Sequence, residues 1–332
     1  AVPGRKTDVK DAEWLCELVQ HGLVRPSFVP PQPVRELRDL TRYRSDVVHE
    51  RTREAQRLEK FLEDAGIKLS LVVADILGKS ARAMLEALIA GERDPRVLSQ
   101  LALGKMRGKI PILSEALTGR FTAHHAFVVR AMLDRIDAAT VTDERLTAEI
   151  GRRLEEHTTP DGRPFRRLID LLVTVPGVSS RAAEVILAEI GTDMSRFPTA
   201  GHLASWAGIC PGNNESGGKR MYGKTRHGDR YLKAVLGQCG SSAGRTKNTY
   251  LAAKYKRIAA RRGPKRAMVA IGHSILVSAW HMITHDIPYA DLGSDHFLDR
   301  LGTEGRARKT RRLVGQLNQL GYQVSLQSVE VA

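Results

Sequence analysis

The apolar residues of this chain recur mostly at the three- and four-residue spacing of one face of an α-helix. Residues 7–20 show the pattern first, in Ala12, Leu15, Leu18 and Val19. This spacing predicts a helix with Thr7 or Asp8 as its N-cap. Residues 26–33 follow with four prolines, which cannot continue a helix, so we expect a linker or an extended crossing segment there.

Two longer helical patterns frame a compact middle section. Residues 34–64 alternate apolar positions with arginines and predict a long, charged amphipathic helix. Residues 122–157 predict a second one, either continuous or broken near residues 140–143. Shorter helices are expected between them, at residues 70–77, 80–90 and 95–103. Two long helices around a compact middle indicate an antiparallel, coiled-coil-like arm over residues 34–160.

The sequence Thr158-Thr-Pro-Asp-Gly162 marks the clearest boundary, and a compact unit is expected after it, at residues 161–295. Helices predicted at residues 168–174 and 181–190 are joined by an apolar-Gly-apolar turn that contains Gly177 and Ser179. This pattern is typical of a helix-hairpin-helix, whose turn amides and second N-terminus can hold a nucleic-acid phosphate. A plain helical turn explains the same residues equally well.

The end of the chain adds an apolar segment and a basic tail. Residues 267–283 are uncharged but include histidines and serines, and they fall short of the roughly 20 residues that span a membrane. We therefore expect a buried helix in a soluble domain and no membrane contact. Residues 296–332 form a basic tail, in which residues 322–326 alternate like a short strand. The predicted fold class is mainly α.

The net charge of the chain restricts its possible functions more than its content of aromatic residues or cysteines does. The 332 residues carry a formal net charge of +15, which favours a polyanionic partner, and nucleic acid is the foremost one. Aromatic residues make up only 5% of the chain, so phosphate contact is a better expectation than base stacking. The cysteines at 16, 210 and 239 lack paired spacing and indicate reduced thiols in the cytoplasm. No signal peptide follows Ala1.

Ser216 is the strongest candidate nucleophile because it lies among glycines, in Glu215-Ser-Gly-Gly-Lys219, at the start of the most basic part of the chain. From Lys219 to Arg266 there are 15 Lys or Arg residues and one acid, Asp229. Glycines let a bulky phosphate approach, and cations stabilise the charge that develops on it. The alternative is that Ser216 caps a turn or helix. The expected DNA contacts are Lys219, Arg220, Lys224, Arg226 and Arg230, with Gly177 and Ser179.

A second set of candidates concerns metals. Asp8 and Asp11 lie three apart, on one face of the first predicted helix, and could share a divalent cation. The alternative is that acids favour the positive end of a helix. His281 and His285 have zinc-ligand spacing but lack a third ligand nearby.

Two further pairs have simpler interpretations. His124 and His125 are expected to cap a helix or to lie on the surface. Ser241 and Ser242 are a second choice of nucleophile, and their position within a predicted helix favours close packing instead.

Three motifs together resemble the insertion-sequence-110 family of transposases. They are Lys6-Thr-Asp-Val-Lys-Asp-Ala12, Leu172-Val-Thr-Val-Pro-Gly-Val178 and Trp206-Ala-Gly-Ile-Cys-Pro-Gly-Asn-Asn-Glu-Ser-Gly-Gly-Lys219. Phe197, Gly228 and Arg230 also fall in the family's order. The resemblance covers nearly the whole chain.

The resemblance implies a RuvC-like nuclease domain with four acids in the order Asp, Glu, Asp, Asp that hold Mg2+, then a helical arm and a C-terminal transposase domain with a nucleophilic serine. Carried over by motif, Asp8 and Asp11 are the last two acids and Ser216 is the serine. Residues 1–33 are then the end of the RuvC-like domain, and residues 161–295 are the transposase domain. We expect the chain to start after the first two acids, which leaves the Mg2+ site incomplete.

The function implied by the resemblance is transposition. Ser216 would attack a DNA phosphodiester and form a phosphoserine link with help from Mg2+. The implied partners are double-stranded DNA, a structured noncoding guide RNA and further copies of the chain in a homodimer or tetramer. The alternative is a non-catalytic architectural DNA-binding protein, which explains the charge but not Ser216 together with Asp8 and Asp11.

Overall fold

The computed structural model describes residues 7–23, 29–210, 215–220 and 225–327, with the backbone alone at 215, 216, 219 and 220. Over this part the protein is mainly helical, as predicted, and its only described sheet is a two-stranded hairpin. In chain order the elements are α1 (Asp8–Gln20), α2 (Gln32–Asp64), η1 (Leu69–Leu71), α3 (Lys79–Ala90), α4 (Pro95–Ser99), η2 (Gly104–Lys109), α5 (Ile110–Ala116), α6 (Ala123–Glu156), α7 (Phe165–Val173), α8 (Ser180–Ile190), η3 (Met194–Arg196), α9 (Ala200–Trp206), β1 (Glu215–Ser216), β2 (Lys219–Arg220), α10 (Arg230–Ala243), α11 (Tyr250–Arg262), α12 (Pro264–His285), α13 (His296–Asp299) and α14 (Thr303–Gln319).

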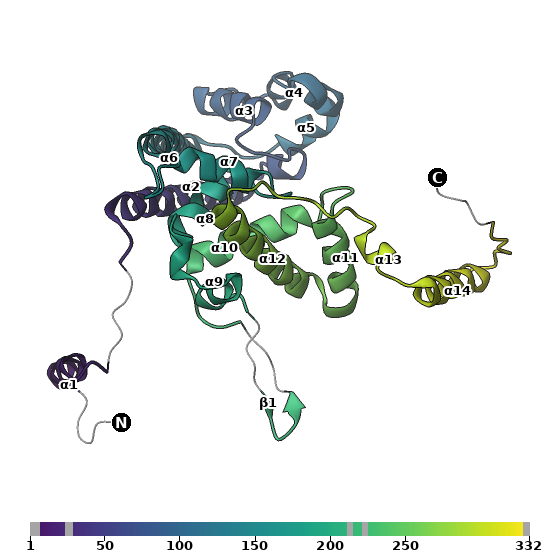
Figure 1. Cartoon of the computed structure of the whole chain (residues 1–332). Coiled ribbons are helices and arrows are strands. Elements are labelled where there is room, and N and C mark those ends of the chain that lie inside the picture. The colour runs from purple at the N-terminus through teal and green to yellow at the C-terminus, as the bar shows by residue number, and fades with distance from the viewer. Residues whose placement is uncertain (1–6, 24–28, 211–214, 221–224, 328–332) are drawn as a thin grey trace.

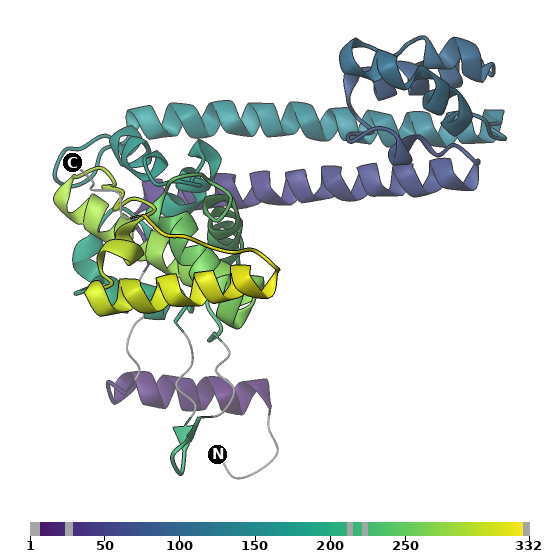
Figure 2. The same cartoon turned by 90° about the vertical axis from the view of Figure 1, so that its right-hand side faces the viewer.

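Helices α2 and α6 run side by side as a long arm, with the short helices α3, α4 and α5 at its far end (Figure 2). α6 is continuous, so of the two expectations the unbroken helix is correct. The hydroxyls of Thr140 and Thr142 donate to the carbonyls of Ile136 and Ala138, at 2.9 and 2.8 Å, and so lie along the helix surface. The two threonines therefore do not end the helix, because their hydroxyls bond to carbonyls of the same helix.

The far end of the arm departs from the prediction in two places. The helix expected at residues 70–77 is wrong, because the chain makes one 3₁₀ turn at Leu69–Leu71 and the Asp75 carboxylate then accepts from the Leu77 amide at 2.9 Å. The helix expected at residues 95–103 ends at Ser99. The amide of Leu103 donates to Ser80 Oγ at 2.9 Å, which takes it out of helical hydrogen bonding.

The second unit is built around α8 and α12. Every residue of α8 from Ala182 to Ile190 is buried, among α2, α7 and α10. α12 is long and apolar enough to cross a membrane by length and composition alone, but it packs against α9, α10 and α11 and buries Ile271, Leu276 and Ile283. The expected buried helix is therefore confirmed.

Glycine allows the closest approach between α10 and α12. A Cβ atom on Gly240 would lie 2.5 Å from the carbonyl oxygen of Met268. Ser241 and Ser242 follow in the same helix. Gly240 therefore serves close helix packing, and the same role for Ser241 and Ser242 stays a prediction.

Helices α7 and α8 are joined by the predicted tight turn. Gly177 is the residue of this turn that adopts a positive φ. Its φ is +88°, and a Cβ atom there would lie 2.4 Å from the backbone nitrogen of Ala243. The turn thus packs directly on the end of α10. Whether it acts as a phosphate-binding helix-hairpin-helix stays a prediction.

Replacing Gly177 by alanine is expected to cost more stability than the same change at Gly162. The two glycines have nearly equal φ values, +88° and +87°, so each substitution strains the backbone by about 1–2 kcal/mol. Only at Gly177 does the new methyl group meet backbone, since nothing lies within 4 Å at Gly162. Overpacking adds about 1–3 kcal/mol. Urea unfolding of both variants measures the difference, and equal losses would contradict the packing role.

The helices at the two ends of the described chain have few contacts with the rest of the protein. Neither α1 nor α14 contains a buried residue. The short strand expected at residues 322–326 is wrong: Tyr322 and Leu326 are exposed and this segment pairs with no described strand. Alternation alone does not make a strand, because an extended backbone also needs a neighbour for its hydrogen bonds. Before α2 the structure describes only α1 as a regular element, so the RuvC-like remnant stays a prediction.

Candidate active site on a projecting hairpin

Ser216 lies beside the turn of the hairpin formed by β1 and β2. Glu215 pairs with Arg220 and Ser216 with Lys219 in antiparallel register. Gly217 and Gly218 form the two-residue turn with φ values of +55° and +73°, which only glycine adopts readily at two successive positions. Nothing lies within 4 Å of a Cβ atom built on either glycine. The hairpin projects from the helical body (Figure 1), so a large substrate can reach its tip.

The two chain segments that lead to the hairpin meet at a pair of glycines. A Cβ atom on Gly228 would lie 2.3 Å from the carbonyl oxygen of Ala207, and one on Gly208 would lie 2.8 Å from that of His227. The backbones are therefore in direct contact at residues 207–208 and 227–228. This contact fixes the base from which the hairpin projects.

Arg42 of the arm helix α2 holds the segment that follows the hairpin. The Asp229 carboxylate accepts from the Leu232 amide at 2.8 Å and so caps α10. Arg42 donates to Asp229 at 3.0 Å and, through two nitrogens, to both carboxylate oxygens of Glu189 at 2.7 Å. The side chain of Glu189 is fully buried. Burial raises the pKa of Glu189, and the Arg42 guanidinium opposes that rise.

Other arginines of α2 fix α8 against the arm. Arg38 donates to the backbone carbonyls of Ala188 and Glu189, at 3.1 and 2.8 Å, and so satisfies the end of α8. Arg44 lies 2.6 Å from a carboxylate oxygen of Glu184, and both residues are buried. The root of the arm, α8 and the base of the hairpin therefore form one connected unit.

The structure places the predicted DNA-contacting residues as follows. Lys219 and Arg220 form β2, described as backbone, and Lys224 lies outside the described residues. Arg226 is exposed. Arg230 is exposed at the start of α10, with its guanidinium 4.6 Å from the centre of the Tyr231 ring and donating to the Tyr231 hydroxyl at 2.7 Å. Tyr231 in turn donates to Asp46 at 3.1 Å.

Exposed cations gather around the turn between α11 and α12, and we call them the α11–α12 basic cluster. Its members are Lys256, Arg257, Arg261, Arg262, Lys265 and Arg266. Within the described ranges none of them forms an ion pair, although Arg257 lies 5.0 Å from the centre of the Phe297 ring. Cations without partners of opposite charge attract a polyanion most strongly.

Comparison with known proteins connects these features to one family. The family described as "Transposase IS116/IS110/IS902 family" matches residues 169–256, and a second transposase family matches residues 1–67. The chain belongs to the IS116/IS110/IS902 transposase family. The insertion-sequence resemblance of the motifs is therefore confirmed. The first match spans the hairpin, its glycine contact and Arg230, and the second spans Asp8, Asp11 and Arg42.

Several curated proteins are similar to this family member. The IS900 uncharacterized 42 kDa protein of Mycobacterium paratuberculosis is 30% identical over 72% of this chain and 60% of its own length. The IS110 uncharacterized 43.6 kDa protein of Streptomyces coelicolor is 28% identical over 70% and 60%. A probable family 20 transposase of Pseudomonas aeruginosa is 25% identical over 71% and 58%. The matched part of the chain thus spans about three fifths of these relatives.

The candidate metal ligands of this IS110-family chain lie apart from the hairpin. Asp8 and Asp11 occupy the first turn of α1, where Thr7 accepts from the Lys10 amide as the predicted N-cap. Figure 1 shows α1 separated from the hairpin, so the described structure does not bring these acids to Ser216. No described group of three His, Cys, Asp or Glu residues could hold a metal. The described residues therefore do not fit a complete Mg2+ site.

Both histidine pairs of this chain contact neighbouring side chains that account for their positions. His125 completes a capping box with Thr122, which confirms the predicted cap. The rings of His281 and His285 stack with centroids 6.1 Å apart beside Trp280. In the described part of the chain they have no third ligand.

Sequence reasoning missed Arg42 and Glu189. Arginines recur throughout residues 35–57, and nothing in their spacing distinguishes the one that reaches the base of the hairpin. The available signal was the pair of glutamates, Glu184 and Glu189, inside the otherwise apolar stretch of residues 182–190, because a buried carboxylate requires a partner.

Proposed function

We propose that this chain carries the serine-bearing part of a DNA transposase that cuts and rejoins DNA strands through Ser216. The observation that supports this most directly is the position of Ser216, next to the glycine turn of a projecting hairpin in a family of transposases. The hairpin base is fixed to the arm through Arg42 and Asp229. A nucleophile that acts on a long duplex must be accessible, and its position on a projecting hairpin meets this need.

The proposed reaction is a transesterification. The hydroxyl oxygen of Ser216 forms a bond to phosphorus while the bond from phosphorus to the neighbouring nucleotide's oxygen breaks. The serine loses its proton and the departing oxygen gains one. The phosphoserine link conserves the phosphodiester bond, so a second DNA hydroxyl can reverse the step and join new strands. Cations that follow the hairpin in the sequence, including Arg226 and Arg230, would stabilise the charge on the phosphate.

Mg2+ and its ligands form a separate part of the proposal. Asp8 and Asp11 would supply two carboxylates to the ion, which when bound neutralises charge on the phosphate. Because the described residues do not complete its ligand set, no step above is assigned to it.

The proposed partners follow from charge and family. Double-stranded DNA, namely the element's ends and its target, would contact the α11–α12 basic cluster. A structured noncoding guide RNA and assembly into a homodimer or tetramer are further proposals. Action on cellular DNA would place the protein in the bacterial cytoplasm.

The test is to trap the covalent intermediate. The product of the complete open reading frame is incubated with Mg2+, RNA from the element's flank, and labelled DNA in which a nick lets the cleaved end diffuse away. We expect a protein–DNA adduct that survives denaturation, with the nucleotide phosphate located on Ser216 by peptide mass spectrometry. Strand exchange without an adduct, or an adduct on another residue, would contradict the proposal.

A non-catalytic architectural protein is the second candidate, and the α11–α12 basic cluster favours it equally. Such a protein binds and bends DNA without cutting it. It gives no reason for a serine beside a glycine turn on a projecting hairpin. If the protein bound DNA that carries both element ends tightly but neither cleaved it nor formed an adduct with it, this candidate would be favoured.

A further inference from the structure

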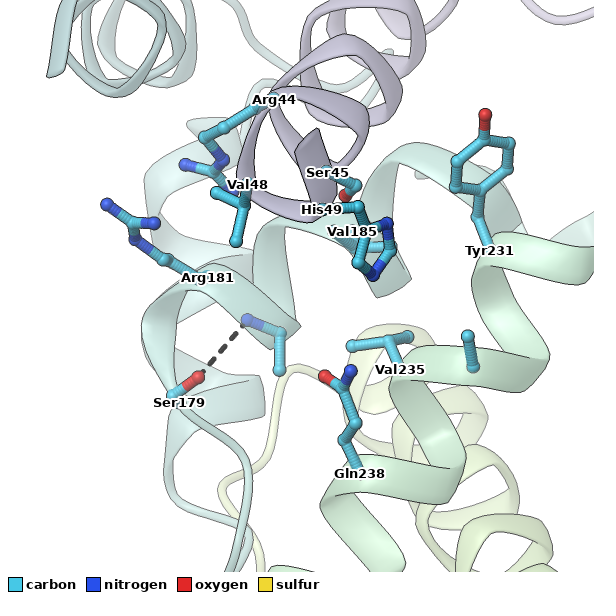
Figure 3. Close-up of a pocket in the computed structure, with 12 residues that line it drawn as sticks. Arg44, Ser45, Val48, His49, Ser179, Arg181, Val185, Tyr231, Val235 and Gln238 are labelled. Atoms are coloured by element: carbon cyan, nitrogen blue, oxygen red, sulfur yellow. Dashed lines mark hydrogen bonds between the residues drawn. The ribbon is translucent and has the colours of Figure 1, made fainter. Parts of the chain in front are cut away.

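An open groove of about 290 Å³ lies where the arm meets the second unit. Three helices supply its walls (Figure 3). The arm helix α2 contributes Arg44 and Val48, α8 contributes Arg181 and Val185 together with its N-cap Ser179, and α10 contributes Val235 and Gln238. No acidic residue is among the described residues that line it. The groove therefore combines positive charge, polar groups and an apolar floor.

Arg44 is the unusual member of this lining. Only 3% of the residue is exposed, and one guanidinium nitrogen approaches Glu184 at 2.6 Å. The other terminal nitrogen, Nη1, is buried and has no hydrogen-bond partner among the described residues. A buried donor left unsatisfied has a free-energy cost, because it has lost its hydrogen bond to water without gaining another. An acceptor in the groove would remove this cost.

The N-terminus of α8 faces the same groove. Ser179 caps the helix by accepting from the Ala182 amide at 3.3 Å (Figure 3). The amides of Ser180 and Arg181 take part in none of the described backbone hydrogen bonds. Free amides and the positive end of the helix dipole attract an anion. Arg181 adds a cation, held in place by Asp143 through contacts of 2.8 and 3.1 Å.

We propose that this groove binds one phosphodiester of a nucleic-acid strand, with the phosphate between Arg44, Arg181 and the first amides of α8. The inference rests on the proposed function, which makes nucleic acid the partner. Val48, Val185 and Val235 form an apolar surface for the sugar, and Gln238 offers a polar contact beside it. The nearby acids each face a partner: Glu184 lies 2.6 Å from Arg44, Asp143 pairs with Arg181 and Asp46 accepts from Tyr231. Glu184 Oε2 is buried and forms no hydrogen bond among the described residues.

This site differs from a conventional helix-hairpin-helix phosphate site in its use of the arm. Gly177, the turn glycine, packs on Ala243. The phosphate contacts come instead from the start of α8 and from Arg44 of α2. A nucleic-acid strand bound here would touch the arm and the second unit at once.

The first test measures binding of labelled single-stranded and duplex oligonucleotides to the 332-residue chain over a salt series. Arg181→Ala is expected to weaken binding about tenfold and to lower the slope of log affinity against log salt by about 1. The matched control is Arg167→Ala, because Arg167 also pairs with a surface carboxylate, Asp286, but lies outside the groove. This control should change neither quantity. Equal effects of the two variants would overturn the proposal.

The second test changes charge without removing a structural contact. Gln238 is exposed, so Gln238→Glu should weaken binding and Gln238→Lys should tighten it, each several-fold. The same exchanges at exposed Gln100, at the far end of the arm, should have no effect. Failure of the two changes at residue 238 to act in opposite directions would overturn the groove assignment.

The source of the phosphate is tested by competition. Inorganic phosphate, added at constant ionic strength, is expected to compete with the oligonucleotide only in the tens of millimolar. Saturable phosphate binding, with oligonucleotide affinity unaffected by the groove variants, would identify a free-anion site and contradict the proposal. A wild-type chain that binds no nucleic acid would instead refute the proposed function itself, so the two failures are distinguishable.

Discussion

Changing Ser216 to alanine is expected to lower DNA strand exchange by about 10³-fold or more and to abolish the protein–DNA adduct. The substitution removes Oγ, and alanine offers no other atom that could form the proposed bond to phosphorus. Nucleic-acid affinity should stay within twofold of wild type, because phosphate contact depends on cations and the serine is uncharged. Strand exchange, adduct formation and equilibrium binding are measured on the same preparation of the complete gene product.

The matched control for this prediction is Ser242→Ala. Ser242 is also a serine close to a glycine, but it lies in α10 beside the packed contact of Gly240 with Met268. Its loss should leave the adduct intact. If Ser216→Ala retained strand exchange while Ser242→Ala abolished it, the nucleophile would lie on α10 and the hairpin assignment would be wrong.

Local patterns predicted most of the helices because each is fixed by residues close together in sequence. The arm helix α2 buries Leu37, Leu58 and Leu62, which recur at the helical spacing visible in the sequence. The cap at Thr7 needed only the three residues that follow it. Where a side chain redirected the chain, as Asp75 does at the Leu77 amide, the apolar pattern alone gave the wrong answer.

The environment of the candidate site was much less predictable, because its contacts join distant residues. Arg42 and Glu189 are 147 positions apart, and Arg42 and Asp229 are 187 apart. No periodicity relates such pairs. The glycines were more informative: Gly208 and Gly228 appeared in the family motifs, and the structure supplies the physical reason, since no side chain fits where the two backbones meet.

Replacing Arg42 by methionine is expected to destabilise the protein by about 3 kcal/mol at neutral pH. Removing one partner of a buried ion pair typically costs about 3–5 kcal/mol, because the other charge is left buried. The lower end applies here, since the Arg42 side chain is 35% exposed and Arg38 remains 3.2 Å from Glu189. The free energy of unfolding in urea measures the loss.

The same variant should become less unstable, relative to wild type, as the pH falls. Burial already raises the pKa of Glu189, and loss of the opposing guanidinium raises it further above its unfolded value of about 4.3. A group with a raised folded pKa contributes stability that is present below its unfolded pKa and is lost as the pH rises through its folded pKa. The deficit of Arg42→Met should therefore be larger at pH 7.5 than at pH 5.

Two further variants separate the buried charge from simple loss of packing. Glu189→Gln should destabilise the wild type, because it leaves Arg42 with Asp229 as its remaining carboxylate partner. It should stabilise Arg42→Met, because it removes a buried charge that then faces Arg38 alone. Arg152→Met is the surface control: Arg152 is 49% exposed and pairs with Glu149 and Glu156 on α6, where such pairs contribute about 0–1 kcal/mol. If Glu189→Gln destabilised both backgrounds equally, packing and not charge would connect the arm to the base of the hairpin.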